Sequence, residues 1–185
     1  MRTVVLVSGS GTNLQAMIDA LHTGDAPVEI AAVGADKPCA GLERAEAAGI
    51  PTFVVRPSEH ADREQWNRAL EREVASHRPD RVVLAGFMRI VDARFVAAFP
   101  GRIINTHPSL LPSFPGAHAV RDALAHGVKI TGATVHEVVA DVDAGPVLAQ
   151  VAVPVRDGDT EDTLHERIKT AERQLLVDTL EALSR

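Results

Sequence analysis

Three polar residues in the second half of the chain have side chains suited to acyl transfer: Asn105, His107 and Asp143. Asn105 and His107 are two residues apart, so an extended backbone places both side chains on one face. An amide can donate to a developing oxyanion, and a carboxylate beside a histidine orients the ring and favours its imidazolium form. The pattern is consistent with acyl transfer to an amine without a covalent nucleophile. Turn and cap roles for each residue are the alternative.

A glycine-rich segment near the start is a second candidate site. The apolar run Val4–Val7 is followed by Gly9, Gly11, Thr12 and Asn13, which is the pattern of a strand, a tight turn and a helix start. Free N–H groups at a helix start bind anions, so we favour a monophosphate site at residues 11–13. A plain strand-to-helix turn is the structural alternative.

A dinucleotide site is the competing functional interpretation of the same loop. Gly9 and Gly11 begin a G-x-G-x-x-G pattern, and Asp36 follows the second predicted strand. Leu14 occupies the position of the third glycine, so the fingerprint is incomplete. A metal site at His107, His118 and His136 is not expected, because their spacing matches no usual zinc pattern.

The elements that must position these residues alternate between short β-branched runs and amphipathic segments. This alternation predicts a doubly wound α/β fold with a mostly parallel sheet over residues 1–185, as one domain. Only about seven residues separate the last two strands, too few for a parallel crossover, so they form an antiparallel hairpin near the C-terminus. Asp159-Thr160 predicts the start of a final helix. The predicted strands are Thr3–Val7, Glu29–Gly34, Thr52–Val55, Arg81–Ala85, Arg102–Thr106, Thr131–Val139 and Val147–Val153.

Composition narrows the classes of partner. The 185 residues carry 19 Lys and Arg against 25 Asp and Glu, a net charge of −6 that disfavours nucleic-acid binding. No run approaches the roughly 20 apolar residues of a membrane span. The single cysteine, Cys39, fits a reducing compartment. We expect a cytoplasmic protein with small-molecule partners, no nucleic acid and no membrane, as a monomer or homodimer.

Five stretches, in this order, closely resemble the phosphoribosylglycinamide formyltransferase family of folate-dependent enzymes. The His-Pro-Ser-Leu-Leu-Pro core with the later Asp-x-Gly is typical of formyltetrahydrofolate enzymes, and the first loop with Leu84–Ile90 narrows the resemblance to this branch. Ala144 departs from the family, which usually has glycine there. The matching stretches are Val4–Ala16, Gly41–Ala45, Val82–Ile90, Asn105–Pro112 and Asp143–Val147.

The resemblance implies formyl transfer from 10-formyltetrahydrofolate, as co-substrate and without a metal, to the amine of glycinamide ribonucleotide in de novo purine synthesis. It implies Asn105, His107 and Asp143 as the catalytic residues. It also implies that the ribonucleotide is bound by Gly11, Thr12, Asn13 and Glu172. The implied folate-site residues are Arg63, Met88, Arg89, Ile90, Val91, Asn105, Val139, Ala140, Asp141, Val142 and Asp143.

Two other functions stay open at this point. Hydrolysis of formyltetrahydrofolate would use the same site with water as the acceptor. A noncatalytic nucleotide-binding module would use Gly9, Gly11 and Asp36 for a dinucleotide. A formyltransferase acting on aminoacyl-tRNA is disfavoured by the negative charge.

Overall fold

The computed structural model describes residues 1–22 and 27–185. Its strands are β1 (Arg2–Val7), β2 (Glu29–Ala35), β3 (Thr52–Val54), β4 (Arg81–Leu84), β5 (Ile103–His107), β6 (Ile130–Glu137) and β7 (Val147–Pro154). Its α-helices are α1 (Thr12–Leu21), α2 (Ala40–Ala47), α3 (Arg63–Ser76), α4 (Ala93–Ala98), α5 (Ala119–His126) and α6 (Glu161–Leu183). A short 3-10 helix spans Pro57–Glu59.

The strands form one seven-stranded sheet in the order β3-β2-β1-β4-β5-β6-β7. The first five are mutually parallel, whereas β6 runs antiparallel to both β5 and β7. The predicted fold class and hairpin are therefore confirmed. The strand predicted over 131–139 instead ends at Glu137, where the backbone enters the 138–146 connection that closes the hairpin. The N–H of Glu137 donates to the carbonyl of Pro146, and this bond joins the two ends of the connection.

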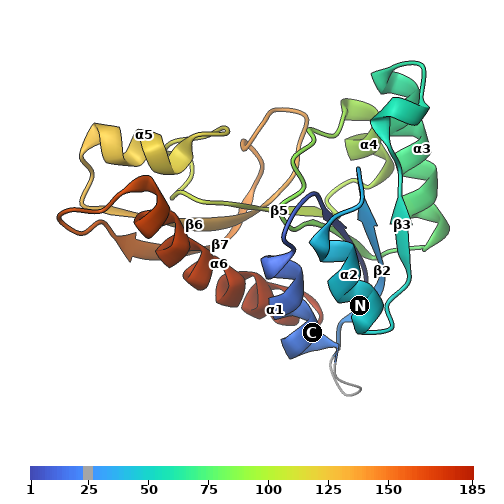
Figure 1. Cartoon of the computed structure of the whole chain (residues 1–185), viewed down its shortest axis with the longest axis horizontal. Coiled ribbons are helices and arrows are strands. Elements are labelled where there is room, and N and C mark those ends of the chain that lie inside the picture. Colours follow the sequence, from blue (N-terminus) through green and yellow to red (C-terminus); the bar gives the residue numbers. More distant parts are fainter. Residues whose placement is uncertain (23–26) are drawn as a thin grey trace.

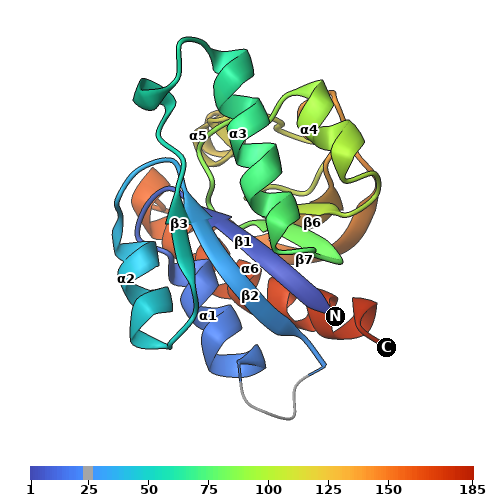
Figure 2. The same cartoon turned by 90° about the vertical axis from the view of Figure 1, so that its right-hand side faces the viewer.

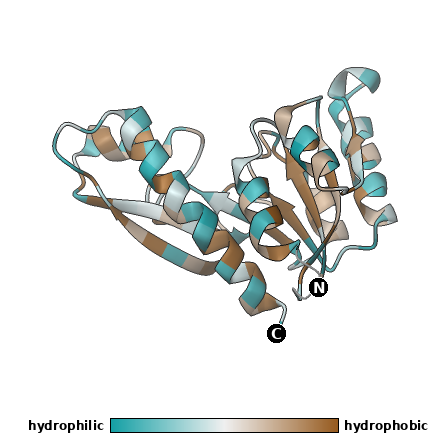
Figure 3. Cartoon of the chain, turned by 60° about the horizontal axis from the view of Figure 1, so that its bottom comes forward, coloured by the Kyte–Doolittle hydropathy of each residue, from teal (hydrophilic) through white to brown (hydrophobic). Residues whose placement is uncertain are grey.

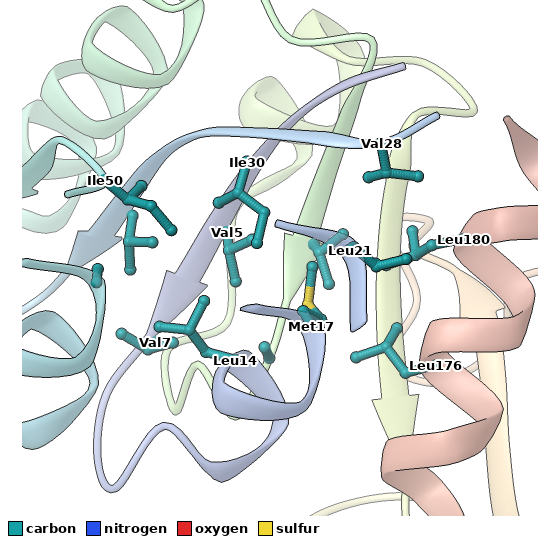
Figure 4. Close-up of a cluster of buried hydrophobic side chains, with 14 of the residues drawn as sticks. Val5, Val7, Leu14, Met17, Leu21, Val28, Ile30, Ile50, Leu176 and Leu180 are labelled. Atoms are coloured by element: carbon teal, nitrogen blue, oxygen red, sulfur yellow. The ribbon is translucent and has the colours of Figure 1, made fainter. Parts of the chain in front are cut away.

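Helices cover both faces of the sheet, as the buried strands require. The cluster that includes Val5, Leu14 and Leu176 joins β1, α1 and α6, and a separate cluster that includes Leu70 and Phe95 joins α3 and α4 to the other face. Figures 1 and 2 show α1, α2 and α6 on one side and α3 and α4 on the other. Figure 4 shows the first of these clusters between β1, α1 and α6. The outer surfaces of the helices are mostly hydrophilic (Figure 3).

Helix α6 begins at the predicted cap. The Thr160 side chain accepts from Thr163 N–H, and the Thr163 side chain accepts from Thr160 N–H, which is a reciprocal capping box. Leu164, Ile168 and Leu176 are fully buried along one side of the helix. These contacts fix the rotation of α6, and with it the direction of Glu172, which the helix carries among its buried residues.

No helix in the described ranges, 1–22 and 27–185, is long and apolar enough to cross a membrane.

Removing the cap hydroxyl should destabilise α6 without touching the candidate site. We expect Thr160→Ala to lower the free energy of unfolding by about 1 kcal/mol, because an N–H of the first turn loses its acceptor. Urea denaturation followed by circular dichroism measures the change. Thr160→Ser keeps the hydroxyl and should unfold close to the wild-type midpoint. Equal midpoints for the alanine variant and the wild type would contradict the role of the cap.

Candidate active site

His107 and Asp143 are brought together at the end of β5. His107 is the last residue of the strand, and Asp143 lies in the connection between β6 and β7. His107 Nδ1 is 3.3 Å from Asp143 Oδ2, and both side chains are more than 90% buried. Asn105, two residues earlier on β5, lies on the same face, as the alternation of a strand requires. The three residues predicted from their types therefore form one cluster.

Both ring nitrogens of His107 face hydrogen-bond acceptors. Nε2 donates to the carbonyl of Phe114 at 2.8 Å, and Nδ1 faces the Asp143 carboxylate. A neutral imidazole carries only one N–H, so it can donate to only one of these two groups. The Phe114 carbonyl and the Asp143 carboxylate therefore hold the His107 ring from opposite sides.

His136 joins this cluster, although the sequence suggested it only as an unlikely metal ligand. Its Nδ1 donates to the Glu137 carbonyl at 2.9 Å, and the Asn105 amide Nδ2 lies 3.1 Å from its Nε2. Burial lowers the pKa of His136, and its bond to Glu137 and the nearby Asp143 carboxylate offset this only in part. Neutral His136 therefore accepts from Asn105, and one N–H of the Asn105 amide remains for a ligand. The signal that could have found it is its position opposite Asn105 in the β5–β6 ladder.

Backbone geometry holds the 138–146 connection over this cluster. Asp143 has a positive φ of 54°, and its Oδ2 accepts from the backbone N–H of Gly116 at 2.8 Å. At Gly145 a Cβ atom would lie 1.8 Å from the carbonyl oxygen of Glu137, so only glycine fits. These contacts explain how the side chain of Asp143, which lies in a loop, can be more than 90% buried.

The first loop has the geometry expected of an anion site. Gly11 adopts a left-handed conformation with φ 67° and precedes α1, and a Cβ there would lie 2.5 Å from the Cα of Gly41. Gln15 N–H is the first in the helix to bond back, to the Gly11 carbonyl. The N–H groups of Thr12 and Asn13 lie in the unpaired first turn, where an anion is favoured. Arg44 Nε donates to the Ser10 carbonyl and holds the loop from α2.

Glu172 lies beside this loop, although 159 residues separate it from Asn13. The Asn13 amide Nδ2 donates to Glu172 Oε1 at 2.8 Å, and Glu172 is only 6% exposed. One N–H of the Asn13 amide is therefore used by Glu172, and its other amide N–H and its backbone N–H remain for a ligand. The structure thus unites two of the residues predicted for the ribonucleotide.

Several residues predicted for folate are exposed apolar side chains. Met88, Ile90, Val139 and Val142 are exposed, at 77%, 59%, 36% and 54%. They lie on the segment after β4 and on the 138–146 connection, in which Ala140 and Asp141 are also exposed.

Arg63 and Val91, from the predicted folate site, each have contacts within the protein. Arg63, at the start of α3, donates from Nη2 to the Ile90 carbonyl at 2.8 Å and so supports the segment after β4. Val91 is 7% exposed and packs in the core with α3 and α4. Its side chain therefore faces away from the site, and only its backbone could contact a ligand.

Asp36 connects the first loop to the segment after β4. Its Oδ1 accepts from the Ser8 hydroxyl at 2.7 Å, and its Oδ2 accepts from Arg89 Nε at 2.8 Å. Ser8 Oγ in turn accepts from Met88 N–H. Burial raises the pKa of the Asp36 carboxyl, but the bonds from Arg89 and Ser8 outweigh it and hold the pKa below its ordinary value. Both carboxylate oxygens are thus in use, which argues against Asp36 as the ribose ligand of a dinucleotide.

Comparison with known proteins decides the family. The formyl transferase family model matches residues 1–180. The chain belongs to the formyl transferase family.

Two named relatives and one solved structure show what this chain is similar to. A phosphoribosylglycinamide formyltransferase of Mycobacterium tuberculosis (strain ATCC 25618 / H37Rv) is 54% identical over 99% of this chain and 85% of its own length. One from Escherichia coli (strain K12) is 47% identical over 95% of this chain and 83% of its own. The crystal structure of glycinamide ribonucleotide transformylase 1 from Symbiobacterium toebii superposes with a TM-score of 0.96. It is 44% identical and covers all of this chain and 87% of that one.

The protonation state of His136 in this formyl transferase can be measured directly. We expect the Nδ1–H tautomer at pH 7 and a pKa below the ordinary 6.5, because burial disfavours the charged ring. A lowered folded-state pKa means that His136 contributes stability above pH 6.5, and that this contribution is lost as the pH falls through the folded-state pKa. Imidazole ¹H–¹⁵N spectra across this range report both tautomer and titration, with His136→Gln to assign the signals. An Nε2–H tautomer, or titration above pH 6.5, would contradict the assignment.

Proposed function

We propose that the protein transfers a formyl group from 10-formyltetrahydrofolate to the amine of glycinamide ribonucleotide, a step of de novo purine synthesis. The names of its relatives support this reaction. The observation that carries the proposal is the buried cluster of Asn105, His107 and Asp143. It lies at the carboxyl end of β5, where open α/β sheets bind ligands.

The ribonucleotide is proposed to enter from the α1 side. Its phosphate would accept from backbone N–H groups of Gly11, Thr12 and Asn13, where the left-handed Gly11 opens the first turn of α1. Glu172, held by Asn13, would accept a hydrogen bond from the glycinamide part. A buried carboxylate beside an anion-binding loop suits an acceptor substrate that carries both a phosphate and an amine.

The folate is proposed to bind on the other side of the cluster. The exposed side chains of Met88, Ile90, Val139 and Val142 offer apolar contact to its ring system. Exposed apolar side chains that gather in one patch are typical of ligand-binding grooves. The remaining proposed contacts are the guanidinium groups of Arg63 and Arg89, the backbone of Val91, the Asn105 amide, and the loop residues Ala140, Asp141 and Asp143.

In the proposed reaction the substrate amine attacks the formyl carbon, and the bond from that carbon to the folate nitrogen then breaks. The amine gives up a proton, and the departing folate nitrogen gains one. Asn105 donates its free amide N–H to the oxyanion that forms. His107 lies in the same cluster and is proposed to donate to the oxyanion as well. Asp143 orients the ring.

The same cluster could act on water, which would make the protein a formyltetrahydrofolate hydrolase. The Asn13–Glu172 pair favours the transferase, because a water acceptor needs neither a phosphate loop nor a carboxylate beside it.

We further propose a cytoplasmic protein whose formyltransferase domain spans residues 1–185 and acts as a monomer or homodimer. Its partners would be the two small-molecule substrates, since the net charge of −6 disfavours nucleic acid.

The test is to follow deformylation of 10-formyltetrahydrofolate with and without glycinamide ribonucleotide. We expect release of tetrahydrofolate only when the ribonucleotide is present, together with an equal amount of formylated ribonucleotide. Release without the ribonucleotide would establish the hydrolase instead. Absence of release in both samples, from protein shown to be folded, would contradict both enzymes.

His107→Ala in the same assay tests the proposed chemistry. The rate should fall by roughly 10² to 10⁴, because the oxyanion loses a hydrogen-bond donor. Calorimetry should still detect binding of the ribonucleotide, since its phosphate site is on α1. His22→Ala, which changes an exposed histidine at the other end of α1, is the matched control and should keep the wild-type rate. Wild-type turnover by His107→Ala would contradict the mechanism.

A further inference from the structure

Thr106 lies between the two proposed catalytic residues of β5 but contacts a different part of the molecule. Its neighbours Asn105 and His107 face the 138–146 connection, and alternation along the strand turns Thr106 to the opposite face, toward α6. There its hydroxyl Oγ1 donates to Oε1 of Glu172. One short strand segment therefore contacts both halves of the proposed site.

Glu172 Oε1 is held from two directions. The Asn13 amide donates to it from the first turn of α1, and the Thr106 hydroxyl donates to it from β5. Oε2 accepts no hydrogen bond from any residue that the structure describes. The carboxylate is therefore locked through one oxygen and leaves the other as an acceptor for a ligand.

We propose that Thr106 is a positioning residue for the ribonucleotide: its hydroxyl holds Glu172 Oε1 so that Oε2 accepts from the glycinamide part of the substrate. This inference rests on the proposed function. A glutamate side chain loses substantial rotamer freedom when it is fixed, so a second donor that fixes it before binding lowers the cost of binding. Thr106 would thus act on affinity for the ribonucleotide and not on the folate.

The test compares Thr106→Val, which replaces the hydroxyl by a methyl group of similar size, with the wild type. We expect the KM for glycinamide ribonucleotide to rise roughly tenfold, as for loss of a hydrogen bond to a charged group. The KM for 10-formyltetrahydrofolate should stay within about twofold. Thr106→Ser keeps the hydroxyl and should recover most of the loss. Calorimetry with the ribonucleotide alone should show the same change in Kd.

Thr3→Val is the matched control, because Thr3 is a buried strand threonine whose Oγ1 has no hydrogen-bond partner among residues 1–22 and 27–185. It should leave both KM values unchanged. A rise in KM for this control as large as that of Thr106→Val would assign the effect to general strand packing and overturn the proposal.

A Glu172→Ala background, which removes the acceptor of the Thr106 hydroxyl, separates positioning from a direct role. If Thr106 acts through Glu172, adding Thr106→Val to Glu172→Ala should change the ribonucleotide KM by less than about twofold. A full tenfold change in that background, or none in the wild-type background, would overturn the proposal. If the wild type formylates the ribonucleotide and Thr106→Val leaves the ribonucleotide KM unchanged, only the role of Thr106 is overturned. Wild-type protein that neither binds nor formylates the ribonucleotide would remove the proposed function as well.

Discussion

The contact between His107 and Asp143 is the interaction on which the rest of the proposed site depends. Both ends of the 138–146 connection are pinned to the sheet. Val138 N–H donates to the Ile103 carbonyl, and Gly145 lies against the Glu137 carbonyl at a distance that only glycine allows. The middle of the connection must therefore arch over β5 before the chain returns to β7 (Figure 1). This arch places a carboxylate in a buried position beside the histidine.

The alternation of β5 then divides two tasks between the faces of one strand. Asn105 and His107 face the arch, where the formyl group is proposed to react. Thr106 faces α6 and contacts Glu172, which Asn13 contacts from the first loop. The capping box and the buried leucines of α6 fix the rotation of that helix, so the position of Glu172 is set by core packing rather than by a flexible loop. The two proposed substrates would thus meet at the end of a single strand.

Much of this arrangement could be predicted from the sequence because it follows from local rules. The spacing of Asn105 and His107 predicts that they share a face, and the short separation of the last two strands predicts their antiparallel pairing. The sequence pattern of a strand, a glycine-rich turn and a helix start predicts the tight turn that Gly11 makes in its left-handed conformation. Glu172 and the folate-site residues could be predicted only from the resemblance to the formyl transferase family, and their roles are proposals.

The remaining features depend on contacts between distant segments, which spacing does not encode. Neither the partnership of Asp36 with Ser8 and Arg89 nor that of Asn13 with Glu172 has a local signal. His136 was missed for the same reason, because it reaches Asn105 only through the register of β6 on β5. The predicted strand over 131–139 was too long, since apolar residues alone do not mark where the connection leaves the sheet at Glu137.

The most direct test of the central claim is a double-mutant cycle on kcat for formyl transfer with His107→Ala and Asp143→Asn. If the carboxylate acts by orienting the histidine, the two residues work as one unit. The double variant should then be hardly slower than His107→Ala alone. Effects that multiply in the double variant would show that the two side chains act independently, and would contradict the account.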